Sequence, residues 1–70
     1  MMKTEKLYEL GYQFINDIGD YDLFVRKNTD SSYHDVYIRY HENINTKDKE
    51  LLVKKEDLLA IEKTIEVIEN

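Results

Sequence analysis

Two histidines and one neighbouring aspartate are the side chains best suited to chemistry in this sequence. A metal site or an acid–base pair needs such groups to converge on one point. His34 and His41 lie on one predicted strand and are an odd number of residues apart, so they point to opposite faces. Asp35 and His41 share a face, but six residues at about 3.3 Å each separate them by roughly 20 Å. The strand itself therefore predicts neither a metal site nor an Asp–His dyad.

Other features associated with catalysis are also missing from the sequence. Ser31 and Ser32 lie close to His34, but serines in a polar turn usually satisfy the turn's own backbone. Gly11 and Gly19 are isolated, which indicates a helix end and a turn and not a phosphate-binding loop. The chain has no cysteine, so thiolate chemistry and disulfides are excluded. We predict a protein that is not an enzyme and that has no catalytic residues, metal or cofactor.

The stretch from Tyr21 to Glu42 would position most of these residues. It alternates between apolar and polar residues on both sides of the polar turn Thr29-Asp30-Ser31-Ser32, which predicts a β-hairpin. A slip of one residue would set apolar side chains against charged ones, so the register is strongly specified. The predicted pairs on one face are Val25 with Val36, Leu23 with Ile38 and Tyr21 with Tyr40. Those on the other face are Arg26 with Asp35, Phe24 with Tyr37 and Asp22 with Arg39.

The second face of this hairpin is the candidate binding face, if both helices cover the first. Its candidate residues are Phe24, Arg26, Tyr33, Tyr37, Arg39 and Lys54. Tyrosine and arginine are enriched at protein interfaces and also stack on single-stranded bases. The alternative interpretation is that these residues only stabilise the hairpin, because Asp35 and Asp22 would neutralise the two arginines. A groove that attracts phosphate should leave its arginines unpaired, so this neutralisation counts more against nucleic acid than against protein.

The segments before the hairpin predict a short helix and a first strand. Thr4 is a plausible N-cap and Gly11 a plausible C′ residue for a helix over 5–10. The strand over 12–17 could turn either Tyr12 and Phe14 or Gln13 and Ile15 inward. We favour the first arrangement, which sets Phe14 against Leu23 and Tyr12 against Val25 in the apolar layer.

The segments after the hairpin predict a fourth strand and a second helix. Residues 49–54 would place Leu51 and Val53 inward. The pairs expected with the third strand are Tyr40 with Leu51, Ile38 with Val53, and His41 with Glu50, whose carboxylate would raise the pKa of His41. Residues 55–69 would form a helix docked on the sheet through Leu58, Ile61, Ile65 and Ile68. We expect Ile65 to be buried, so that Ile65→Ala costs roughly 2–5 kcal/mol.

These elements together predict one α+β domain over residues 1–70. It has a short N-terminal helix, an antiparallel four-stranded meander in the order 1-2-3-4, and a C-terminal helix packed on one face of the sheet. A chain of 70 residues with 41% hydrophobic residues and six tyrosines is more apolar than a disordered acidic tail. The net charge of −5 opposes general binding to phosphate backbones. No segment has the plan of a signal peptide or a membrane span, so we expect a cytoplasmic protein without membrane contact.

Three segments together resemble a known group of proteins. They are the opening Leu-Tyr-Glu-Leu-Gly-Tyr, the hairpin Tyr-His-Asp-Val-Tyr-Ile, and the closing Asp-Leu-Leu-Ala-Ile-Glu. In these segments the chain is similar to small phage or prophage proteins of AT-rich Gram-positive bacteria. That resemblance implies a small noncatalytic module that binds and modulates a host protein.

The alternative function is single-stranded nucleic-acid binding through the aromatic and arginine face. The two functions make different demands on charge, because only the nucleic-acid function needs arginines that are free to meet phosphate. Lysines 47, 49 and 54 would protect the last strand from edge pairing, so we expect a monomer and not a homodimer.

Overall fold

The sheet is organised around the predicted hairpin, whose register is confirmed. In the computed structural model, which describes residues 2–58 and 60, strand β2 spans Tyr21–Lys27 and strand β3 spans Tyr33–Tyr40. Val25 lies opposite Val36, and Phe24 lies opposite Tyr37. The turn is held by side chains at its start, since the Asn28 carboxamide oxygen accepts a hydrogen bond from the Asp30 amide at 2.8 Å. Local polarity sorting was therefore sufficient to fix this pairing.

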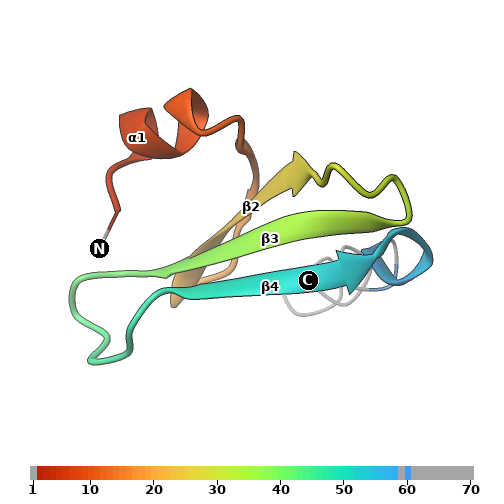
Figure 1. Ribbon diagram of the computed structural model, residues 1–70. Helices are drawn as coiled ribbons and strands as arrows, with labels where there is room; N and C mark the ends of the chain where they lie inside the picture. Colours follow the sequence, from red (N-terminus) through yellow and green to blue (C-terminus); the bar gives the residue numbers. More distant parts are fainter. Residues whose placement is uncertain (1, 59, 61–70) are drawn as a thin grey trace.

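Two further strands extend the hairpin into the predicted meander (Figure 1). Strand β1, Gln13–Asp17, pairs with β2, and strand β4, Lys49–Lys54, pairs with β3. All neighbours are antiparallel, and the sheet order is β1-β2-β3-β4. Helical residues begin again at Lys55, directly after β4. The predicted α+β class and strand order are confirmed.

Helix α1, Thr4–Glu9, begins one residue earlier than expected, and Gly11 takes the predicted C′ position after it. Its N-cap is Lys3, which makes no side-chain capping bond, so the prediction that Thr4 is the N-cap is wrong. Gly11 has φ +92°, in the left-handed region where glycine is favoured. The amides of Gly11 and Tyr12 donate to the carbonyls of Tyr8 and Leu7, both at 3.0 Å. This is the Schellman arrangement, and it turns the chain from α1 into β1.

Apolar side chains pack on both faces of the sheet, not on one. Figure 1 shows α1 on one side and the start of the C-terminal helical segment on the other. The expectation that both helices cover the same face is therefore wrong for α1. The buried residues on the α1 side are Leu7, Tyr12, Phe24 and Tyr37. Those on the other side are Ile18, Leu23, Val25 and Val36, and Leu58 packs against them.

The pairing of β1 with β2 overturns the expected placement of the first strand. Phe14 pairs with Phe24, and the register then shifts so that Asn16 pairs with Leu23. Phe14 therefore lies on the α1 face, and Tyr12 packs into the α1-side cluster, so neither contributes to the layer of Leu23 and Val25. Tyr12 and Phe14 do lie on one side of the sheet, as predicted. That side is the one covered by α1, so the predicted face, shared with Leu23 and Val25, is wrong.

The register of β4 differs from the prediction by four residues. Leu51 lies opposite Val36 instead of Tyr40, and Val53 lies opposite His34 instead of Ile38. An even shift keeps each side chain on its predicted face, which is why polarity sorting could not detect the error. The connection therefore runs from residue 41 to residue 48, longer than expected.

His41 consequently has a different partner from the one predicted. Glu50 lies opposite Tyr37, while the His41 Nε2 atom is 2.9 Å from Asp22 Oδ1. The hydrogen bond with Asp22 raises the pKa of His41 above its ordinary value, and the charges of Asp22 and Asp17 act in the same direction. The predicted direction of the shift is confirmed, whereas the predicted partner is wrong. The prediction for Ile65 and the docking roles of Ile61 and Ile68 lie outside the described residues.

Candidate functional site

The predicted binding face lies beneath α1 and is largely inaccessible. The Phe24 side chain is 0% exposed and that of Tyr37 is 5% exposed. Leu7 of α1 and Tyr12, which follows the helix, form one buried cluster with these two residues. The two aromatic residues expected to lead this surface therefore form a core, and they offer no ring face to a ligand.

Arg26 and Arg39 form the predicted ion pairs and also stack on rings of this core. The Arg26 Nε and Asp35 Oδ2 atoms are 2.9 Å apart, and Arg39 Nη2 lies 2.6 Å from Asp22 Oδ2. The Arg26 guanidinium carbon is 4.3 Å from the centroid of the Tyr12 ring. That of Arg39 is 4.9 Å from the Phe24 centroid. Each guanidinium thus has a carboxylate and a cation–π partner within the chain.

The same arginines fasten the N-terminal segment to the sheet. Arg26 Nη1 donates to the Leu10 carbonyl at 2.8 Å. Arg39 Nη1 donates to the Thr4 hydroxyl at 2.6 Å and to the Met2 carbonyl at 3.3 Å. These bonds support the interpretation that the arginines stabilise the structure.

The Asp35 carboxylate gives a pH-dependent test of this interpretation. The hydrogen bond from Asn28, 2.7 Å long, lowers the pKa of Asp35; burial opposes this change, and Arg26 adds to the lowering. A group with a depressed folded pKa stabilises above its unfolded pKa, near 3.9, and loses that contribution as pH falls through the folded value. We expect Asp35→Asn to cost about 1 kcal/mol at neutral pH. Urea unfolding over a pH series should show this difference shrinking below about pH 4, and a difference that persists unchanged in acid would contradict it.

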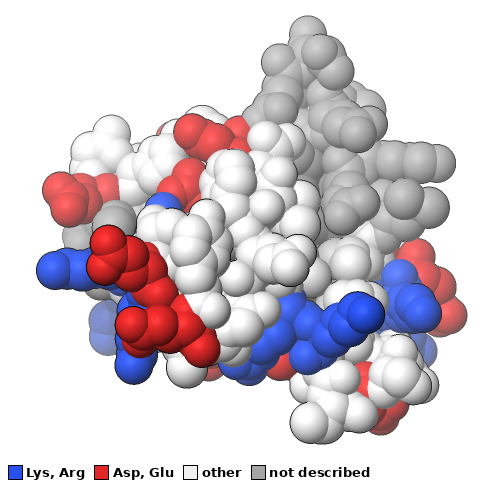
Figure 2. All heavy atoms as spheres, turned by 90° about the horizontal axis from the view of Figure 1, so that it is seen from above, with Lys and Arg blue, Asp and Glu red and all other residues white. Residues whose placement is uncertain are grey.

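Tyr33 and Lys54 complete the predicted face at its far end. They lie opposite each other across β3 and β4, Tyr33 half-buried and Lys54 exposed. Figure 2 shows the molecule from the α1 side, where uncharged atoms fill the middle and acidic and basic groups lie together around them. The six predicted residues share a face but do not form one exposed aromatic and arginine surface.

An exposed apolar surface lies instead beside the sheet edge formed by β1. We call these residues the β1-edge patch: they are Tyr8, Leu10, Phe14 and Ile15, which are 53%, 39%, 45% and 38% exposed. Ile15 lines a hollow with Val25 and His34, on the face opposite α1. The rings of Tyr8 and Phe14 both pack edge-on against Phe24, with centroids 6.5 and 5.6 Å from it. Exposed apolar side chains grouped beside a terminal strand are typical of interaction surfaces.

Sequence reasoning missed this patch, although one signal was present. Residues 7–15 contain six apolar side chains, more than one face of a short helix and strand can bury. The apolar side chains that this segment cannot bury are the exposed residues of the β1-edge patch. The bulge in β1, which sets the exposure of Ile15, had no recognisable sequence signal.

The opposite edge, β4, is apolar but guarded by charge. Leu51 and Leu52 are 44% and 59% exposed. Lys49 and Lys54 stand at the two ends of the strand. Lysine on an edge strand opposes pairing with a further strand, so β4 is the less suitable of the two edges for strand addition.

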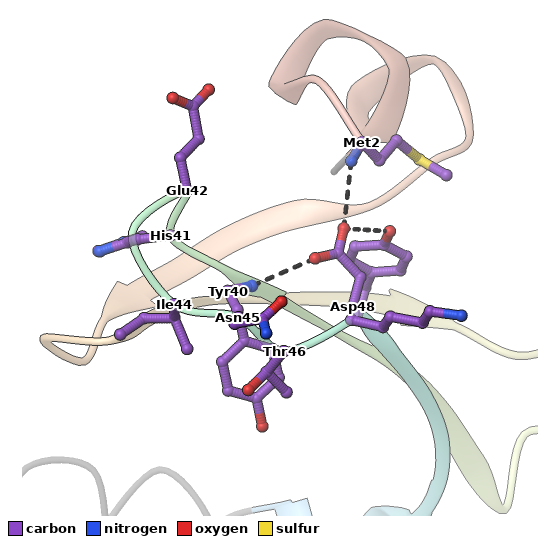
Figure 3. A pocket seen from close by; sticks show the side chains of 10 residues that line it. Met2, Tyr40, His41, Glu42, Ile44, Asn45, Thr46 and Asp48 are labelled. Carbon is purple, nitrogen blue, oxygen red and sulfur yellow. Dashed lines mark hydrogen bonds between the residues drawn. The ribbon is translucent and has the colours of Figure 1, made fainter.

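A shallow pocket of about 800 Å³ lies between β3 and the connection to β4 (Figure 3). The Asp48 carboxylate at one side accepts hydrogen bonds from the Tyr37 hydroxyl at 2.7 Å, the Met2 amide at 3.1 Å and the Tyr40 amide at 3.3 Å. Burial raises the pKa of Tyr37, and the Asp48 carboxylate adds to this rise, so the phenol stays protonated and donates. Asp48 is thus engaged in joining three segments of the chain and in closing the β3–β4 connection.

Comparison with protein-family models, curated proteins and solved structures finds no match for this chain. Among the described residues, no helix is long and apolar enough to cross a membrane.

Proposed function

We propose that this chain is a noncatalytic protein-binding module of phage or mobile-element type, which binds a host protein in the cytoplasm through the β1-edge patch. The observation that carries the proposal is the exposed apolar surface of Tyr8, Leu10, Phe14 and Ile15 beside a terminal strand. Aromatic residues, tyrosine among them, are enriched at protein interfaces and among the residues that carry most of the binding energy.

The backbone of β1 offers a second means of attachment. Since β1 is the first strand in the sheet order, one of its sides has no strand neighbour among the described residues. An extended partner segment can add to such an edge by main-chain hydrogen bonds. Residues 13–17 contain no lysine or arginine, in contrast to β4. The β1 edge therefore lacks the positive charges that discourage strand addition.

The same contacts disfavour single-stranded nucleic acid as the ligand. Phe24 and Tyr37 are buried, so they cannot stack on bases. Arg26 and Arg39 are paired with carboxylates, and the chain carries a net charge of −5. Binding of phosphate would have to break these pairs first.

Affinity capture from a Gram-positive host lysate, with partners identified by mass spectrometry, tests the proposal. We expect Phe14→Lys to abolish enrichment of the partner, since losing a central aromatic contact costs about 2 kcal/mol, or roughly 30-fold in affinity. Leu52→Lys is the matched control, because it places the same charge on the other edge and should leave capture unchanged. Equal capture by both variants would refute the β1-edge assignment.

Two solution measurements separate the competing ligands. Labelled RNA and DNA oligonucleotides should show no binding; binding that weakens steeply with salt would favour the nucleic-acid alternative. Light scattering should show a monomer at micromolar concentration, whereas a dimer lost in Phe14→Lys would identify a second copy as the occupant of the patch.

A further inference from the structure

Three metal-binding side chains converge at one end of the sheet, away from the β1-edge patch. They are Asp17 at the end of β1, Asp22 near the start of β2, and His41 just after β3. One ligand atom from each lies within 4.8 Å of the others. His41 Nε2 is 2.9 Å from Asp22 Oδ1 and 3.7 Å from Asp17 Oδ1.

The bulge in β1 creates this convergence. With the pairing of Gln13 and Phe14 continued unchanged, Asn16 would lie opposite Asp22; the shift between Phe14 and Asn16 places Asp17 there instead. Two carboxylates directly opposite each other on neighbouring strands repel, which favours a cation between them in addition to Arg39, which already pairs with Asp22. Bulges often re-aim a side chain at a functional site.

Asp22 is held in an orientation suitable for a ligand. Its Oδ2 atom accepts the 2.6 Å hydrogen bond from Arg39, which leaves Oδ1 directed at His41. The Asp22 side chain is only 13% exposed, so packing limits its rotation. A hydrogen bond to the second oxygen of a ligating carboxylate is the usual outer-shell support of a metal site.

His41 is fixed by its backbone on the third side. Its amide donates to the Asp20 carbonyl at 3.0 Å, which ties the end of β3 to the β1–β2 turn. Its side chain is 33% exposed and that of Asp17 is 60% exposed. The cluster is therefore reachable from solvent, and one side of it remains open to water.

The donor types and the two separations from His41 Nε2 fit zinc. Bonds of about 2.0–2.2 Å at the tetrahedral angle place neighbouring donor atoms roughly 3.4 Å apart. The two separations to His41 Nε2, 2.9 and 3.7 Å, lie on either side of that value. An imidazole nitrogen with two carboxylate oxygens suits zinc and neighbouring transition metals, whereas Mg²⁺ and Ca²⁺ prefer oxygen alone.

We propose that Asp17, Asp22 and His41 form a binding site for one Zn²⁺ ion, with the remaining coordination position open to water. The ion would join the ends of three strands and offset the repulsion between the two aspartates. Arg39 supports the site through Asp22 and does not contact the ion.

Calorimetric titration of the full chain, free of any histidine tag and treated with chelator, tests this proposal. The probe is a zinc salt, added at a pH above the raised pKa of His41, so that the imidazole is neutral. We expect saturable binding at a ratio of one ion per chain, at least tenfold weaker in His41→Gln and in Asp17→Asn. His34→Gln is the matched control, because it removes the other histidine, which lies on the opposite face, and should bind as tightly as the wild type.

NMR localises the ion independently of affinity. Zinc should shift the ring signals of His41 and leave those of His34 in place, while a magnesium salt at the same concentration should shift neither. Asp17 is exposed, so Asp17→Asn should fold normally. If a variant at His41 fails to fold, Asp17→Asn still tests the proposal. Absence of saturable zinc binding, or equal binding by wild type and His41→Gln, would overturn the proposal.

Discussion

Replacing Phe24 with alanine is expected to destabilise the protein by about 3–5 kcal/mol, as for other buried aromatic residues. The Phe24 side chain is 0% exposed and is packed among Leu7, Tyr12 and Tyr37. Small domains have total stabilities of about 5–15 kcal/mol, so the variant should lose a large share of that margin. Urea unfolding followed by circular dichroism measures the change.

Phe14→Ala is the matched control for this result. Phe14 lies opposite Phe24 and contacts it edge-on, but it is 45% exposed and should lose far less stability. If Phe24→Ala does not fold, Phe24→Leu should retain the fold with a smaller loss. A loss below about 1 kcal/mol for Phe24→Ala would mean that α1 does not cover this face.

The contrast between Phe24 and its surroundings explains why the second core was not predicted. On the hairpin, Phe24 and Tyr37 lie between the pairs Arg26–Asp35 and Asp22–Arg39, a pattern typical of a solvated face. The guanidinium groups, however, lie over the rings of Tyr12 and Phe24. Long charged side chains can cover apolar surface while their charged ends bind carboxylates. The charged residues on either side of Phe24 and Tyr37 therefore did not indicate that these two rings are exposed.

The strand register could be predicted where the pairing had to match polarity on both faces of the sheet. It could not be predicted where only one face constrained the pairing. For β2 and β3, pairing had to satisfy polarity on both faces, and only the observed register does so at short loop length. For β4, the alternation of Leu51 and Val53 fits the third strand at several even shifts. The contacts that accompany the actual register run from Asp48 to Tyr37, Tyr40 and Met2, and the contact with Met2 joins residues 46 positions apart.

The candidate sites depend on such long-range placements even more strongly. His41 is the residue after the last pair between β2 and β3, and this position brings it to Asp22. The bulge in β1 brings Asp17 to the same place. Neither partner lies on the same strand as His41. Of the three residues of this site, only His41 was considered for chemistry from the sequence; Asp17 and Asp22 were not considered as ligands, because the pairing of different strands brings them to His41.

Arg39→Met is expected to destabilise the protein by about 3 kcal/mol, at the lower end of the range for breaking a buried ion pair. Methionine keeps the unbranched stem but removes every donor, so Thr4, Met2 and the Asp22 Oδ2 atom all lose a hydrogen bond. The side chains of Arg39 and Asp22 are 14% and 13% exposed, which leaves little room for water to replace these bonds.

Arg26→Met is the closest comparison that the chain offers. Arg26 also pairs with an aspartate across β2 and β3, stacks on an aromatic ring and bonds to the N-terminal segment. Its side chain is 34% exposed, and a pair of this kind contributes about 0.2–1 kcal/mol. Urea unfolding of both variants should therefore show the larger loss for Arg39.

A double-mutant cycle with Asp22→Asn measures the coupling free energy between Arg39 and Asp22. Because the two groups are in direct contact, the combined variant should be more stable than the sum of the single losses implies, by about 0.5–3 kcal/mol. Losses that simply add would show that Arg39 and Asp22 do not stabilise each other, and a greater loss for Arg26→Met than for Arg39→Met would contradict the ranking of the two pairs by burial.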